Sequence, residues 1–314
     1  MIDIRRRGEG MYINKLFRIL AILVLMIASC TVKEIQQPPP VVQPSVQPPP
    51  KPARIALVLG AGSSKGFAHI GVLKILESNK IPIHMIVGTS VGSAVGSLYA
   101  YGYDAFKLQK LSFSMGKEDI IDLLYIPNNG FIKGEKLEEF INKSVKNTPM
   151  EKLKIPFYAV ATDLEKGQEI VFGKGNTGTA VRASCSIPGI FRPVKIADKM
   201  YVDGGVVSPV PVEAAKRFGA DVVIAVDISS GIERSQPEGT IEAILQSINI
   251  MYSKLGSIQA SQADVVIRPK VSHIGSTDFS KKHEAILEGE KAAIEALPQI
   301  MAIITQLRQE GKLE

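Results

Sequence analysis

The stretch "RIALVLGAGSSKGFAHIGVLKILESNK", residues 54–80, decides the fold. It starts with a short apolar run of the β-strand type and continues through a loop of closely spaced glycines. After the loop, apolar residues recur with the spacing of a helix that buries a broad face, at Phe67, Ile70, Val72, Leu73, Ile75 and Leu76. A strand, a glycine loop and a helix in this order are typical of the first unit of an α/β domain.

The same strand pattern returns further along the chain, in "HMIVG" (84–88), "PFYAVAT" (156–162), "DVVIAVDIS" (221–229) and "DVVIRP" (264–269). These runs are continuously apolar, which is typical of parallel strands covered on both faces. We therefore predict an α/β fold: a three-layer sandwich with a mostly parallel central sheet covered by helices on both faces. No second linker interrupts residues 54–314, which we interpret as one catalytic domain. Its last segment, 281–314, predicts one or two amphipathic helices.

The first 29 residues have the features of an export signal. A basic stretch ending at Arg18 precedes the apolar run "ILAILVLMIAS", which is too short to span a bilayer comfortably and ends in small residues. The tetrad from Ile27 to Cys30 resembles the lipobox of bacterial lipoproteins, in which the cysteine is acylated. We predict a lipoprotein signal peptide over 1–29 and lipidation of Cys30; a plain signal peptide or a short core helix is the alternative. Either Met1 or Met11 serves as the start.

A proline-rich segment follows the predicted lipidation site. Residues 38–52 contain eight prolines, a composition that favours extended polyproline II and forms no core. We interpret residues 30–53 as a lipidated linker that holds the domain away from a membrane in the bacterial cell envelope. Thr31, which follows the cysteine where some lipoproteins have aspartate, favours the outer membrane over the inner one by resemblance to enterobacterial lipoproteins. The alternative, a ligand for proline-binding modules, fits an exported chain less well.

Composition gives no sign of a nucleic-acid partner. The chain has 314 residues, is 45% hydrophobic and 22% charged, and carries a formal net charge of +6. Five of its basic residues precede residue 30, and no basic stripe with interleaved aromatic residues is present. Cys30 and Cys185 are the two cysteines, so lipidation of the first excludes an intramolecular disulfide. No metal-ligand spacing occurs, and we predict neither a metal nor a cofactor.

Ser90 is the candidate nucleophile. In "VGTSVGS" the pattern G-x-S-x-G, from Gly88 to Gly92, follows a predicted strand and precedes a predicted helix, which is the context of a nucleophile elbow. The two glycines let backbone pass close to a serine on a strained turn. A serine at this position also caps helices, so the alternative is a purely structural N-cap.

None of the histidines is well placed to act as a base for Ser90. Of the four histidines, His69, His84, His273 and His283, only His273 lies in a loop-like stretch after a predicted strand. Asp163, Asp203 and Asp227 each close a predicted strand, at the edge that should present Ser90. Asp203 is followed by Gly204 and Gly205, which allow a tight turn and close approach to another loop. An ordinary turn residue is the alternative interpretation.

The glycine loop "LGAGSSKG", residues 59–66, offers backbone N–H groups between a strand and a helix, with Lys65 beside them. Such a loop suits an acyl oxyanion. It resembles a dinucleotide fingerprint, but its spacing is G-x-G-x-x-x-G and no acidic residue ends the next strand. It also lacks the Gly-Lys-Ser/Thr sequence that closes a P-loop.

Together these motifs resemble the patatin-like phospholipases. The resemblance rests on "GAGSSKG" running into "FAHIGVLKILE", on "GTSVGS", on "RASCSIPGIFRPV" and on "DGG", and it covers most of residues 55–230. It implies a serine–aspartate dyad without histidine, with Ser90 as nucleophile and Asp203 as base. It places oxyanion donors in the backbone of Gly60, Ala61, Gly62 and Ser63, and supporting roles at Lys65, Gly66, Gly88, Gly92, Gly204 and Gly205. Many members have a third glycine at position 61 and arginine at position 65, so the sequence of this loop departs from the family pattern, and the side chain of Ala61 must avoid a positive φ.

The resemblance implies a lipid acyl hydrolase that cleaves phospholipid or lysophospholipid esters. A transacylase that uses the same acyl-enzyme, and a non-catalytic lipoprotein that binds lipid in the same cleft, are the alternatives. Residues 104–126 carry many apolar side chains and form either a lipid-facing flap beside the elbow or ordinary core helices. Cys185 has no histidine partner and is interpreted as a small buried residue.

Overall fold

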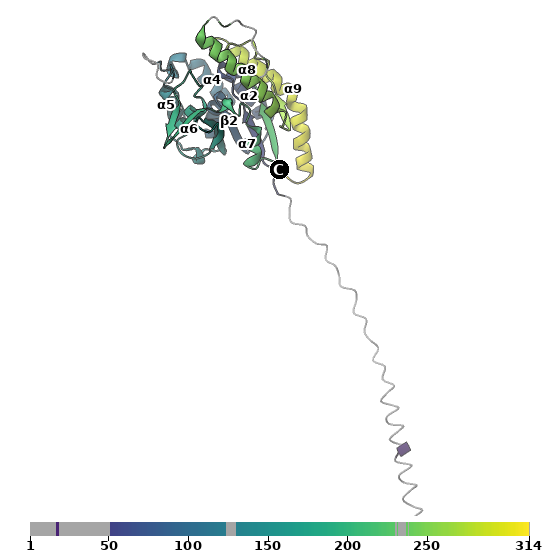
Figure 1. The fold of residues 1–314 in the computed structure, drawn as a ribbon. Helices are drawn as coiled ribbons and strands as arrows, with labels where there is room; N and C mark the ends of the chain where they lie inside the picture. Colours follow the sequence, from purple (N-terminus) through teal and green to yellow (C-terminus); the bar gives the residue numbers. More distant parts are fainter. Residues whose placement is uncertain are drawn as a thin grey trace, which may run out of the picture. The chain divides into compact units, whose positions relative to one another are not determined.

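The computed structural model describes residues 17–18, 51–123, 130–229, 231, 237 and 239–313. Its contacts divide the chain into two units, Met1–Pro48 and Pro49–Glu314, and the second unit contains every strand and helix discussed below (Figure 1). The predicted signal peptide apart from residues 17–18, Cys30 and most of the proline-rich linker lie outside the described residues. At the start of the second unit, the amide of Ala53 donates to the carbonyl of Lys312 at 2.8 Å, which joins the two ends of the domain.

An eight-stranded sheet forms the centre of this unit, in the order β5-β6-β3-β2-β1-β7-β8, with β4 paired to β3. Five strands pair in parallel: β1 (Ile55–Leu59), β2 (Met85–Thr89), β3 (Phe157–Asp163), β7 (Val222–Val226) and β8 (Val265–Ile267). Three strands pair in antiparallel fashion: β4 (Gln168–Phe172), β5 (Val194–Ile196) and β6 (Lys199–Asp203). The parallel strands are those that the sequence predicts.

Strand β3 determines where the candidate residues meet. One edge of β3 pairs with β4 over residues 159–163, so β2 and β6 share the other edge. On that edge β2 runs parallel to β3 and ends with Thr89 opposite Val160, whereas β6 runs in the opposite direction and ends with Asp203 opposite Ala161. The carboxyl ends of β2 and β6 therefore meet head-on, one residue apart along β3.

Helices cover both faces of the sheet. Successive side chains of a strand point to opposite faces, and the buried residues of β1 follow this rule. Leu57 and Leu59 belong to a large core with α2, α3 and α9, whereas Ala56 and Val58 belong to a second core with α7 and the end of α8. The structure thus confirms the predicted three-layer sandwich.

The helices are α2 (Phe67–Ser78), α3 (Val91–Tyr101), α4 (Ala105–Ser114), α5 (Glu135–Ser144), α6 (Thr177–Ser184), α7 (Val212–Arg217), α8 (Thr240–Ala260) and α9 (Lys282–Gln309), with short 3-10 turns η1 (Ser63–Gly66), η2 (Lys117–Asp119), η3 (Met150–Lys152) and η4 (Gly204–Val206). The predicted last segment is the single long helix α9, which packs along α2 (Figure 1). The antiparallel strands β4 and β5 are not predicted by the sequence, because they are only partly buried and lack a continuous apolar run.

Candidate active site

Ser90 occupies the turn between β2 and α3, and its backbone is strained. Its φ of 55° and ψ of −129° are rare for a residue with a side chain. Two glycines make the turn sterically feasible. A Cβ atom on Gly92 would lie 2.1 Å from the carbonyl oxygen of Leu59, and one on Gly88 would lie 2.6 Å from the backbone of Gly92. These positions have the geometry of a nucleophile elbow.

The hydroxyl of Ser90 points to Asp203 and does not cap α3. Ser90 Oγ donates to Asp203 Oδ2 at 2.6 Å, whereas no cap hydrogen bond forms from this side chain. Both residues are buried. The contact joins positions 113 residues apart, and it follows from the head-on meeting of β2 and β6 along β3. The N-cap interpretation of Ser90 therefore fails, and the predicted pair is brought together.

The carboxylate of Asp203 is also fixed on its other oxygen. Its Oδ1 accepts from the amide of Gly205 at 2.7 Å, so the turn interpretation of this residue holds alongside the contact with Ser90. Burial in an apolar environment raises the pKa of Asp203 from 3.8 to about 6, although hydrogen bonds from Ser90 and Gly205 lower it. At neutral pH the carboxylate is mostly charged. Its raised pKa lies close to the working pH, as suits a general base.

Residues outside the predicted set hold the backbone of the pair. Ser184, at the end of α6, accepts from the amide of Ser90 at 2.9 Å and donates to the carbonyl of Val160 at 2.6 Å. The hydroxyl of Thr162 donates to the carbonyl of Asp203 at 2.9 Å. Ser184 lies within "RASCSIPG", a sequence motif that marks the region without assigning a role to this hydroxyl.

The glycine loop divides into two halves. The amides of Gly60 and Ala61 donate to backbone carbonyls of Val226 and Pro209, at 3.0 and 2.9 Å. The prediction of oxyanion donors at Gly60 and Ala61 is corrected on this point, because these N–H groups are already engaged. No described residue accepts a hydrogen bond from the amides of Gly62 and Ser63, which follow in the loop.

The rest of the loop supports this geometry. Ser63 has a positive φ of 51°, and it lines an apolar cavity together with Ser90. Lys65 is buried, with 2% of its surface exposed. Gly66 lies against the first residue of α3, where a Cβ atom would come within 2.1 Å of Val91 Cγ2. The loop therefore packs directly on the helix that begins after Ser90.

Two histidines are buried or engaged at the sheet. His69 Nε2 lies 2.9 Å from the carbonyl oxygen of Gly60 and therefore donates to it. Burial lowers the pKa of His69 to about 4, so the ring is neutral at physiological pH. The Nδ1 atom of His84 accepts from the amide of Ile55, at the amino end of β1 and away from Ser90. Both observations agree with their exclusion as bases.

The other two histidines lie on α9 or contact it. His273 Nε2 is 2.6 Å from an oxygen of Glu284, and both side chains are about half exposed. The ring of His283 stacks on Phe113, with 6.1 Å between centroids. No histidine forms a hydrogen bond with Ser90 or Asp203 in the described part of the chain.

The two competing carboxylates serve their own loops. Asp163 accepts from the amides of Glu165 and Lys166, both at 3.1 Å. Asp227 accepts from the amide and the hydroxyl of Ser229, at 3.0 and 2.7 Å. Of the three strand-ending aspartates, Asp203 is the one bonded to Ser90.

A mainly apolar cavity of about 750 Å³ opens beside Ser90. Its walls come from α2, α3, α4, α5 and α8 and from the loop after β8. The segment 104–126 contributes Leu108, Leu111 and Met115 to these walls, whereas Phe106 and Phe113 are 71% and 47% exposed. The described part of this segment is thus both a wall of the cavity and an apolar surface; residues 124–126 lie outside the described residues.

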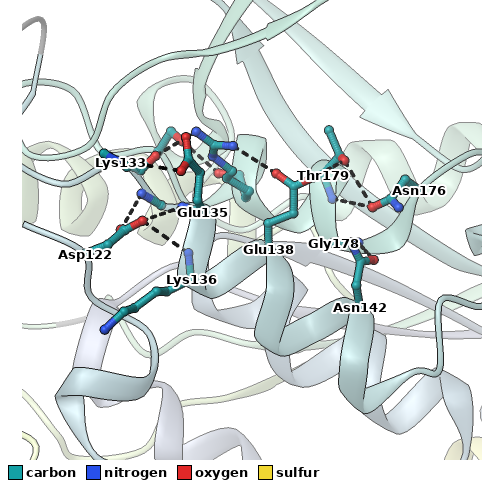
Figure 2. A network of polar contacts seen from close by, with 12 residues as sticks. Asp122, Lys133, Glu135, Lys136, Glu138, Asn142, Asn176, Gly178 and Thr179 are labelled. Carbon is teal, nitrogen blue, oxygen red and sulfur yellow. Dashed lines mark hydrogen bonds and ion pairs between the residues drawn. The ribbon is translucent and has the colours of Figure 1, made fainter.

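A polar network fastens one wall of the cavity (Figure 2). The carboxylate of Asp122 accepts from the amides of Gly134 and Glu135, at 2.7 and 2.9 Å, and so caps the start of α5. Farther along α5, Glu138 accepts from Thr179 Oγ1 at 2.6 Å and lies 3.0 Å from Arg182 Nη1. The wall is therefore tied to α6, the helix that ends at Ser184.

Cys185 lies in the same cavity, next to the pair. Its thiol is 3.9 Å from the hydroxyl of Ser93, and burial raises its pKa well above the usual range. A protonated thiol is a poor nucleophile. In the described part of the chain, no group of histidine, cysteine and acidic side chains has the arrangement of a metal site. Among the same residues, none of the helices combines the length and the hydropathy of a membrane span.

The geometry defines the class of site: an α/β domain with a serine on a strand-to-helix turn, paired with a buried carboxylate beside a glycine loop. The model of the family "Patatin-like phospholipase" matches residues 57–216, a range that includes Ser90 and Asp203. The chain belongs to the patatin-like phospholipase family.

The chain spans less than half the length of the two curated relatives described next. The chain is 30% identical over 279 residues to "Lysophospholipase NTE1" of Coccidioides immitis, which covers 78% of this chain and 18% of that protein. It is 36% identical over 179 residues to an uncharacterized NTE family protein of Mycobacterium bovis, covering 56% of this chain and 49% of the relative. The solved complex ExoU-SpcU from the type III secretion system of Pseudomonas aeruginosa gives a TM-score of 0.49 at 16% identity, covering 80% of this chain and 52% of the other.

Proposed function

We propose that the protein is a serine acyl hydrolase that cleaves acyl esters of phospholipids or lysophospholipids. The observation that carries this proposal is the 2.6 Å hydrogen bond from Ser90 Oγ to Asp203 Oδ2, on a strained elbow beside a glycine loop. Membership of the patatin-like phospholipase family supports it. The relative from Coccidioides immitis is named a lysophospholipase.

In the proposed reaction, Ser90 Oγ attacks the ester carbonyl carbon while its proton passes to Asp203 Oδ2. The carbonyl oxygen becomes an oxyanion that accepts hydrogen bonds from the amides of Gly62 and Ser63. Collapse of this intermediate breaks the bond to the alcohol, which leaves with the proton from Asp203. Water then gives a proton to Asp203 and attacks the acyl-enzyme, and the fatty acid departs as Ser90 regains its hydrogen.

The cavity supports a lipid as the acyl donor. A volume of about 750 Å³ with mainly apolar walls suits a hydrocarbon chain, whose burial is favourable by about 0.8 kcal/mol per CH₂ group. The acyl carbonyl would lie at Ser90, and the chain would extend between α3 and α5.

Purified protein tests this proposal with a fluorophosphonate probe and with lysophospholipid substrates. We expect wild type to label at Ser90 and to release fatty acid, and we expect Ser90→Ala and Asp203→Asn to lose release by at least about 1,000-fold. Asp163→Asn is the matched control, because this buried carboxylate ends the neighbouring strand and, among the described residues, contacts its own loop and Lys199 and not Ser90. Undiminished release by either dyad variant refutes the dyad. A labelled lysolipid acceptor distinguishes hydrolysis from acyl transfer.

We also propose that acylated Cys30 anchors the domain in the bacterial cell envelope, with the outer membrane favoured by Thr31. The support is the lipobox-like tetrad and the proline-rich linker that follows it. Two acyl chains are enough for stable anchoring, whereas one is marginal. Incorporation of labelled fatty acid into wild type but not into Cys30→Ala is expected, and equal incorporation into both proteins contradicts the anchor.

A further inference from the structure

Tyr252 of α8 lies against the turn that follows Asp203. Its side chain is buried, with 4% of its surface exposed. A Cβ atom on Gly205 would lie 2.3 Å from Tyr252 Cζ and 2.7 Å from its hydroxyl oxygen. The absence of a side chain at Gly205 therefore makes room for the phenol. The amide of Gly205 also donates a hydrogen bond to Asp203 Oδ1. The phenol of Tyr252 therefore lies next to a backbone group that contacts the carboxylate.

The hydroxyl of Tyr252 forms no hydrogen bond of ordinary geometry with a described residue, although the Asp203 carboxylate is near enough to raise its pKa. A buried hydroxyl without a close partner is unfavourable, and a hydrogen bond to that carboxylate would satisfy it. Tyr252 belongs to a buried apolar cluster that includes Ala61 of the glycine loop and Ile187. The charged group that faces the hydroxyl is the Asp203 carboxylate.

We propose that Tyr252 is a positioning residue, whose hydroxyl donates a hydrogen bond to the Asp203 carboxylate when that carboxylate is charged. This inference rests on the proposed function of Asp203 as the base. Ser90 already donates to Oδ2 and Gly205 to Oδ1, and a charged carboxylate can accept further hydrogen bonds on both oxygens. Catalytic hydrogen bonds are often long or poorly aligned in the absence of substrate, and a small movement of the phenol toward Asp203 supplies the third donor.

The titratable groups that face Asp203 are Tyr252 from α8 and Cys185 from the end of α6. Burial and the nearby carboxylate raise the pKa of both Tyr252 and Cys185, so both stay neutral at physiological pH. The influence of Tyr252 on Asp203 opposes that of burial and lowers the pKa of the carboxyl. Removal of the phenol hydroxyl should therefore raise the pKa of Asp203.

The test compares Tyr252→Phe with wild type in the full chain, from about pH 5 to about pH 9, by kcat/KM and by the rate of fluorophosphonate labelling at Ser90. We expect the acid limb of both profiles to move upward by about one pH unit, with about tenfold loss below the limb and recovery above it. Tyr201→Phe is the matched control, because this buried tyrosine lies two residues before Asp203 but is influenced by Asp163 instead. Its profile should coincide with that of wild type.

A limb that stays in place, or an equal loss of rate at every pH, overturns the inference, since either indicates that the ring only fills space. Incorporation of 3-fluorotyrosine at position 252 keeps the shape and strengthens the donor, so its limb should move in the opposite direction. If wild type proves inactive, the proposed function fails but this inference is still tested. The pH dependence of unfolding reports the Asp203 titration directly, and Tyr252→Phe should shift it upward.

Discussion

Replacing Asp203 by asparagine should stabilise the fold at neutral pH while it abolishes the proposed reaction. The pKa of this carboxyl rises from 3.8 to about 6 because the folded state buries it. A raised folded-state pKa means that the folded protein binds the proton more tightly than the unfolded chain does. The stabilisation is therefore complete below about pH 3.8 and is lost as the pH rises through about 6.

The magnitude follows from the same two values. A rise from 3.8 to about 6 corresponds to about 3 kcal/mol in the free energy of unfolding, to order of magnitude. Wild type should lose this amount relative to Asp203→Asn between the two pH values, because asparagine does not titrate. Above the upper value the difference should be constant.

Urea unfolding of wild type and Asp203→Asn at several pH values measures this difference. A constant offset from altered hydrogen bonding cancels, since only the change with pH is compared. Ser90→Ala is a useful third protein: it keeps the carboxylate but removes one donor, so its stability should fall further with rising pH than that of wild type. Parallel curves for wild type and Asp203→Asn would refute the assignment of a raised pKa to this residue.

Three more predictions concern residues of the site and the excluded histidine. Gly92→Ala should lower the free energy of unfolding in urea by about 2 kcal/mol or more, because a Cβ atom there meets a backbone carbonyl. Gly167→Asn is the control: this glycine has a φ of 63° and open space around it, so the free energy of unfolding should change by less than about 0.5 kcal/mol. Ser184→Ala should lower kcat by about tenfold with KM little changed, because it frees the backbone of the nucleophile; Ser97→Ala, a buried serine of α3, is the control, and equal effects would contradict the positioning role. His273→Ala should retain full kcat/KM, and a large loss would show that the dyad is incomplete.

The parallel part of the fold could be predicted because its strands are continuously apolar. Leu57 and Val87 belong to such runs, and both are buried. The strands β4 and β5 could not be predicted in this way. Glu169 and Lys195 interrupt their apolar residues, so their pairing depends on contacts with β3 and β6 that no local pattern encodes.

The candidate site shows the same division. Ser90 and Asp203 could be predicted from the glycines beside them, because a tight turn requires glycine at nearby positions in the sequence. Gly60 and Ala61 were predicted as oxyanion donors from the same kind of trace, but whether an amide is engaged depends on carbonyls far along the chain. Tyr252 lies on a helix whose sequence resembles any half-buried helix, and only the fold brings it to the carboxylate.

The shared edge of β3 has a consequence for how such proteins tolerate change. The distance between Ser90 and Asp203 is set by the pairing of β2 and β6 with adjacent residues of β3. Loops among the 113 positions that separate the two residues can therefore lengthen or shorten without altering that distance. A slip of β6 by a single rung, by contrast, would turn the Asp203 side chain to the opposite face of the sheet. Loop insertions in this enzyme family should therefore be common between the two motifs and absent from the strand that measures the distance between them.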